Sequence, residues 1–234
     1  MMKKMFFLLV TLCFTTACSM SEEDVVEETI AASDEVNNYT LDITTANPNE
    51  EEDSEYTLKI DLENTLGYIT SEYTNEHGRT SEELYYNSET VFEKLSDSDW
   101  TISSLQVEDM HEYYFVDYTQ IAQVLEYIEP MEETSFEALD ETYEFSYQSD
   151  NQSDATALLE EWGFNLGEEP VTDASIVFHI NNDNYYIENI ELEYTMQVGS
   201  DTEIDLTQQL DYQNINDTED IERPEGTLSE NSIS

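Results

Sequence analysis

Residues 190–198 read Ile-Glu-Leu-Glu-Tyr-Thr-Met-Gln-Val, the longest run of strict apolar–polar alternation in the chain. Successive side chains of a β-strand point to opposite faces of a sheet, so a period of two predicts a strand with one face in a core and the other in water. A surface helix would instead repeat its apolar residues every three or four positions. The run therefore predicts a sheet with one apolar face, which would carry Ile190, Leu192 and Tyr194.

The same alternation recurs along most of the chain. In one such run, Leu58, Ile60 and Leu62 alternate with polar residues. Asn, Asp, Gly and Pro separate the runs, which is typical of strands joined by turns in an antiparallel sheet. The predicted strands are 39–43, 56–62, 66–72, 81–86, 91–95, 100–102, 143–147, 176–180, 190–198 and 204–212.

Two stretches, residues 118–128 and 153–162, change to helical spacing. The first ends before a proline and the second before a glycine, which are both stop signals for a helix. A third helix with one apolar face is expected within the acidic residues 19–37, and a solvated tether is the alternative. The apolar faces of the two central helices include Ile121, Leu125, Leu158 and Trp162.

Acidic residues dominate the composition. The chain has 56 Asp and Glu and six Lys and Arg; from residue 18 onward, four basic against 56 acidic residues leave a formal charge of −52. Such a charge repels nucleic acid and anionic lipid surfaces. The 16 Tyr, 9 Phe and 2 Trp favour a folded domain with an acidic surface over a disordered chain. Adaptation to a salty habitat explains this surface, and calcium loading is the alternative.

The first 18 residues are typical of an export signal. Lys3 and Lys4 precede an apolar run of ten residues, which is short of the about 20 that a membrane-spanning helix needs. Ala17 and Cys18 follow, and they resemble the end of a bacterial lipobox, in which the cysteine is acylated and becomes the new N-terminus. We therefore expect Cys18 to carry the acyl chains, including palmitate, of a membrane anchor on the extracytoplasmic face. The alternative is an ordinary secretory signal.

These observations divide the chain into four parts. We expect a signal peptide at 1–17, an acylated cysteine with a tether and helix at 18–38, a sheet-and-helix domain at 39–226 and a disordered tail at 227–234. If Cys18 is acylated and the signal removed, no thiol remains for a disulfide, a zinc site or catalysis.

The sequence offers no enzyme signature. It has neither a Gly-x-Ser-x-Gly elbow nor a glycine-rich phosphate loop. His77, His111 and His179 stand in unrelated contexts, and no pair of carboxylates is singled out among 56. We therefore expect no catalytic residues, no metal site and no cofactor. The oligomeric state is left open.

Three local features resemble the lipoproteins of the LolA, LppX and LprG-like superfamily, and most closely those of Gram-positive bacteria within it. They are residues 83–100, with two tyrosines, a polar turn and a tryptophan; residues 176–192, with two strands and an Asn/Asp turn; and residues 220–225, with an Ile-x-x-Pro segment. The order of elements agrees over residues 22–226.

The resemblance implies an α+β fold, in which a curved antiparallel half-barrel sheet carries helices on its concave face after an N-terminal helix. It also implies an apolar or amphiphilic ligand, such as a lipid, between sheet and helices. A filled core and a surface protein without a small ligand are the alternatives. The residues expected to line the ligand site are Leu58, Ile60, Leu62, Ile121, Leu125, Leu158, Trp162, Ile190, Leu192 and Tyr194.

Overall fold

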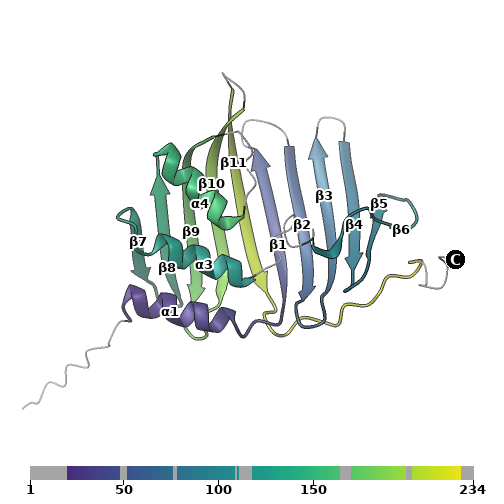
Figure 1. Ribbon diagram of the computed structural model, residues 1–234, viewed down its shortest axis with the longest axis horizontal. Helices are drawn as coiled ribbons and strands as arrows, with labels where there is room; N and C mark the ends of the chain where they lie inside the picture. Colours follow the sequence, from purple (N-terminus) through teal and green to yellow (C-terminus); the bar gives the residue numbers. More distant parts are fainter. Residues whose placement is uncertain are drawn as a thin grey trace, which may run out of the picture.

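One open antiparallel sheet of eleven strands forms the frame of the molecule (Figure 1). The computed structural model describes residues 20–47, 52–75, 78–108, 110, 118–163, 170–198 and 202–227. The strand order is β6-β5-β4-β3-β2-β1-β11-β10-β9-β8-β7, so the first and last strands of the chain meet at the centre. The strands are β1 Asn38–Asn47, β2 Glu52–Asp61, β3 Leu66–Asn75, β4 Gly78–Tyr86, β5 Val91–Leu95, β6 Thr101–Ile102, β7 Thr134–Ala138, β8 Thr142–Ser149, β9 Val171–Asn181, β10 Ile187–Val198 and β11 Thr202–Gln213.

Strand β10 contains the alternating run that predicted the sheet. Ile190, Leu192 and Tyr194 are buried, whereas the glutamates between them are exposed. Its neighbours are β9 and β11, in antiparallel register on both sides. The side chains of this strand therefore alternate between a core face and a solvent face, as the period of two predicted.

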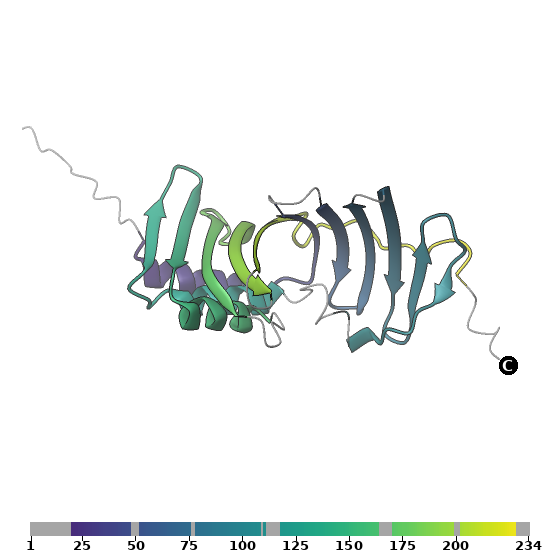
Figure 2. The same ribbon diagram turned by 90° about the horizontal axis from the view of Figure 1, so that it is seen from above.

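Three helices of the described residues lie on one face of the sheet, which we call the inner face (Figures 1 and 2). They are α1 Glu22–Ser33, α3 Tyr118–Ile128 and α4 Gln152–Trp162. The helix α1 begins with a capping box in which Ser21 and Asp24 exchange hydrogen bonds, and α4 ends at Gly163 in the left-handed conformation. These local signals explain why the helices start and stop near the predicted positions. The outer face is the opposite one.

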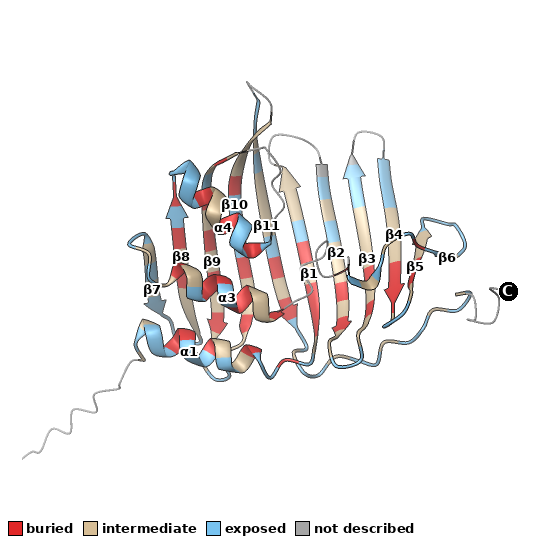
Figure 3. Ribbon diagram, in the orientation of Figure 1, coloured by how far each residue is buried: buried red, intermediate tan, exposed pale blue. Residues whose placement is uncertain are grey.

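The three helices cover only part of the inner face. They lie over β7–β10, which we call the helix-covered half; β1–β5 form the other half, and the sheet curves between the two (Figure 2). Helix α4 packs on β8 and β9, and α3 packs between α1 and α4. Buried positions run through the helix-covered half, whereas in β1–β4 they gather at one end of the strands (Figure 3).

The hydroxyl group of Tyr118, at the start of α3, joins this helix to the sheet. It accepts a hydrogen bond from the backbone nitrogen of Ile187 at 2.6 Å and donates one to the carbonyl oxygen of Ile187 at 3.0 Å. Ile187 lies beside a register shift in the pairing of β10 with β9. The Tyr118 ring also packs edge-on against Tyr212 at a centroid distance of 5.0 Å.

The predicted fold class is confirmed: a large open antiparallel sheet with helices on one face and a helix before the first strand. Two elements differ from the prediction. Strand β7 was not expected, because Phe136 is its one large apolar residue. Strand β6 is shorter than expected and comprises Thr101 and Ile102 alone. The signal segment with Cys18, as well as His77 and His111, lies outside the described residues.

Candidate functional site

The ten residues expected to line a ligand site belong to the packed core or lie against it. Nine are buried, with exposures between 0% and 6%, and Leu62 is partly buried against the same core. Trp162 stacks on Phe178 beneath α4, which shows how closely helix and sheet approach. Their role as ligand contacts stays a prediction. The side chains beneath the helices are buried and belong to one hydrophobic core.

The inner face of β2–β4 changes in character along the strands. The register places its residues in rows across the three strands. From the packed end outward, these rows are Leu58–Ile69–Leu84, then Tyr56–Ser71–Glu82, then Ser54–Tyr73–Thr80. The first row is aliphatic and buried, whereas the next two hold two serines, a threonine, a glutamate and two tyrosines. Small side chains leave space where an apolar row would fill the face, and a hollow forms there.

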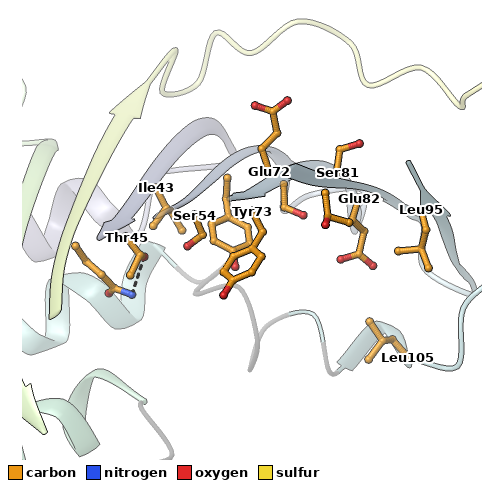
Figure 4. Close-up of a pocket in the computed structure, with 13 residues that line it drawn as sticks. Ile43, Thr45, Ser54, Glu72, Tyr73, Ser81, Glu82, Leu95 and Leu105 are labelled. Carbon is orange, nitrogen blue, oxygen red and sulfur yellow. Dashed lines mark hydrogen bonds between the residues drawn. The ribbon is translucent and has the colours of Figure 1, made fainter. Parts of the chain in front are cut away.

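This hollow is a groove with a volume of about 670 Å³. It falls within the range of about 300–1,000 Å³ that is usual for small-molecule sites. Its walls come from β1–β5 and β11 and from the chain segment that contains Leu105 (Figure 4). The apolar and charged side chains that face it are Ile43, Tyr56, Tyr73, Glu82, Leu95 and Leu105.

The groove exposes apolar surface to solvent. Tyr73 is 41% exposed and Leu95 is 54% exposed, although both are large apolar side chains. Glu72 and Ser81 line the groove through their backbone, since their side chains point to the outer face (Figure 4). At its polar end, the Gln208 side chain donates a hydrogen bond to the Thr45 hydroxyl. An apolar wall with a few polar groups at one end fits an amphiphilic molecule.

Glu82 places a carboxylate inside the groove. Partial burial raises its pKa, and the nearby Glu93 carboxylate raises that pKa further. Glu93 lies on the inner face beside Glu82, because it pairs with Leu84, and it accepts a 2.6 Å hydrogen bond from the Ser103 hydroxyl. Within the part of the chain that the structure describes, no hydrogen bond or ion pair reaches the Glu82 carboxylate.

The cations of the described residues all lie on the outer face of the same half of the sheet. The Lys94 ammonium pairs with Glu83 at 2.6 Å, and the Arg223 guanidinium covers the ring of Phe92 at 4.9 Å. The other two pairs are Arg79 with Glu72 and Lys59 with Glu219. Among the described residues, the side chains that line the groove therefore include the Glu82 carboxylate and no Lys or Arg.

His179 lies on the outer face, since it alternates with the buried Phe178 and Ile180. Its ring is between Glu144 and Glu191, at 3.8 and 3.7 Å, and its side chain is 25% exposed. Among the described residues, no three side chains of His, Cys, Asp and Glu are arranged to hold a metal ion. None of the described helices has the length and apolar character to cross a membrane.

The groove residues were not predicted from the sequence. A signal for them exists in the polar residues at inner positions: Ser71 and Glu82 stand where the alternation calls for apolar residues. Recognising the groove requires the register between strands, because a polar residue that interrupts the alternation in a single strand does not by itself indicate a hollow.

The curved open sheet with helices on one face resembles a solved protein structure. It is similar to that of LprF from Mycobacterium bovis, with a TM-score of 0.52 and 12% identity over 87% of this chain and 96% of that chain. At this identity the likeness shows the fold alone.

A β-barrel-like protein from Brucella abortus aligns with a TM-score of 0.24 and 10% identity, over 76% of this chain and 98% of that chain, and supports no argument. No protein-family model and no curated protein sequence matches the chain.

Proposed function

We propose that this protein is a membrane-anchored extracytoplasmic lipoprotein that binds an apolar or amphiphilic molecule in the groove on β1–β5. The groove carries the proposal, because it combines a ligand-sized volume with exposed Tyr73 and Leu95. Exposed apolar surface gathered in a concavity is unfavourable in water and favours a ligand. The binding place is thus beside the helices, where small side chains leave room, rather than beneath them.

A second function is favoured by one observation. The interior beneath the helices is filled, and a filled interior is what a structural or interaction protein of the cell surface would need. In that case the groove would hold solvent. The two functions differ in whether an apolar probe enters the groove.

A groove-filling substitution tests the first function. The chain is produced with Cys18→Ser, so that no acyl chain occupies the groove, and is titrated with an uncharged fluorescent apolar dye. Ser71→Phe places a ring in the middle of the groove and should weaken binding at least about tenfold, because the volume is lost. Ser81→Phe is the matched control, since its side chain points to the outer face. If the probe binds neither the parent chain nor the variants, the protein has no such ligand site.

Native mass spectrometry of the Cys18→Ser chain provides an independent test, since a ligand retained from the host would appear as added mass.

Anchoring is tested in the cell: Cys18→Ser should release the protein into the medium or leave an unprocessed precursor. A processed variant that stays in the membrane fraction would contradict the lipoprotein assignment.

A further inference from the structure

The groove has a charge pattern that distinguishes between ligand head groups. Its two ends are apolar, with Ile43 on β1 at one end and Leu95 and Leu105 at the other. Glu82 points into it, and Glu93 adds a second carboxylate on the same face. The four cations that the structure describes lie behind the sheet, where they contact outer-face carboxylates and the ring of Phe92. A ligand in the groove therefore meets negative charge and apolar surface together.

We propose that the groove selects amphiphiles with a positively charged head group, such as a quaternary or primary amine on an apolar tail. This inference rests on the proposed function and specifies the class of its ligand. The tail lies against apolar side chains of the groove, and the head group lies beside the Glu82 carboxylate.

Two contacts favour the cation. The Glu82 carboxylate lies in a partly desolvated place, where an opposite charge is attracted more strongly than in bulk water. The rings of Tyr56 and Tyr73 line the same groove, and aromatic faces attract quaternary ammonium groups. An anionic head group would instead meet Glu82 and Glu93 with no cation to balance them, which disfavours fatty acids.

The groove also explains the position of Glu82. A partly buried carboxylate without a cation opposes folding at neutral pH, because desolvation disfavours its charged form. Perturbed carboxylates of this kind, when they lie in a cleft, are candidates for functional sites. A cationic head group supplies the charge that this site lacks.

The test uses three amphiphiles that share a decyl tail: decyltrimethylammonium, decyl sulfate and decanol. Each is titrated, below the concentration at which it forms micelles, into the Cys18→Ser chain with the fluorescent dye bound, and displacement of the dye reports its affinity. The measurements are made in about 1 M sodium chloride, where the Debye length of about 3 Å suppresses the distant field of the acidic surface. We expect decyltrimethylammonium to bind at least about tenfold tighter than decyl sulfate, with decanol between them.

Glu82→Gln should reduce the ratio of the affinity for decyltrimethylammonium to the affinity for decyl sulfate by at least about fivefold. Glu55→Gln is the control, because it removes the same charge two strands away, on the outer face. Thermal unfolding of both variants verifies that they fold.

Each result decides a separate point. Equal binding of the three probes, or tighter binding of decyl sulfate, would overturn the charge selection and leave the groove as an apolar site. An unchanged ratio in Glu82→Gln would overturn the role of this carboxylate. No binding of any probe would overturn the proposed function, and this inference with it.

Discussion

Replacing Tyr118 by Phe tests how α3 is held on the sheet. The substitution removes one hydroxyl and keeps the ring, which is 1% exposed and packs against Tyr39 and Tyr212. The hydroxyl accepts a hydrogen bond from the backbone nitrogen of Ile187, at 2.6 Å, and donates one to its carbonyl oxygen. A buried polar group that loses its partner costs about 1–3 kcal/mol. The nitrogen loses its partner and the carbonyl loses one of its own, so we expect a destabilisation of about 2–3 kcal/mol.

The assay is chemical and thermal unfolding of the Cys18→Ser chain with and without Tyr118→Phe. In a domain of this size, each kcal/mol of destabilisation lowers the Tm by about 2–4 °C, so we expect the Tm to fall by about 4–12 °C. Tyr127→Phe is the control, because Tyr127 is partly buried on the same helix and should change stability by less than about 0.5 kcal/mol. If Tyr118→Phe stays within 0.5 kcal/mol of the parent, the hydrogen bonds to Ile187 do not hold the helix on the sheet.

Three further predictions concern charge and packing. Glu82→Gln should raise the unfolding midpoint at neutral pH and leave it unchanged near pH 4. The pKa of Glu82 is higher in the folded protein than its ordinary value of 4.5, so the folded protein loses stability as the pH rises from 4.5 through the folded-state pKa; thermal unfolding over a pH series would detect the difference. Gly67→Ala should destabilise the domain by about 1–3 kcal/mol in urea unfolding, because the added methyl group overlaps the buried ring of Tyr86. The thermal midpoint should rise steadily from low to molar sodium chloride, whereas a sharp rise with micromolar calcium would reveal a metal site instead of screening.

The strands and helices of the helix-covered half were predictable because each is indicated by a pattern in its own residues. The alternation of Ile190 to Val198 requires one apolar face whatever lies next to it. The helix starts and stops were equally local, as the capping box at Ser21 and the left-handed Gly163 show. Strand β7 was missed for the same reason: its contribution to the core, Phe136 against Phe145 at 4.8 Å, depends on a partner strand and leaves little trace in its own residues.

The groove could not be predicted from one strand, because it depends on three. Tyr56, Ser71 and Glu82 are far apart in the sequence and share a row only through the register of β2, β3 and β4. The ten predicted ligand residues are apolar inner-face positions, and such positions are also the ones that the core buries. Strong apolar patterning identifies a core, whereas an interruption of the pattern at matching rows identifies a cavity.

The same alternation that builds the core also separates the charges in β1–β5. A period of two gives every residue of a strand a fixed face, so Lys59, Lys94 and Arg79 project away from the groove because of their position alone. Glu82 has the opposite parity and projects into it. In dilute salt the acidic surface and Glu82 would attract the same cationic ligand, whereas in molar salt only contact at the groove remains effective. A protein adapted to high salt would therefore need a carboxylate inside the groove to keep any preference for a cation, and Glu82 has that position.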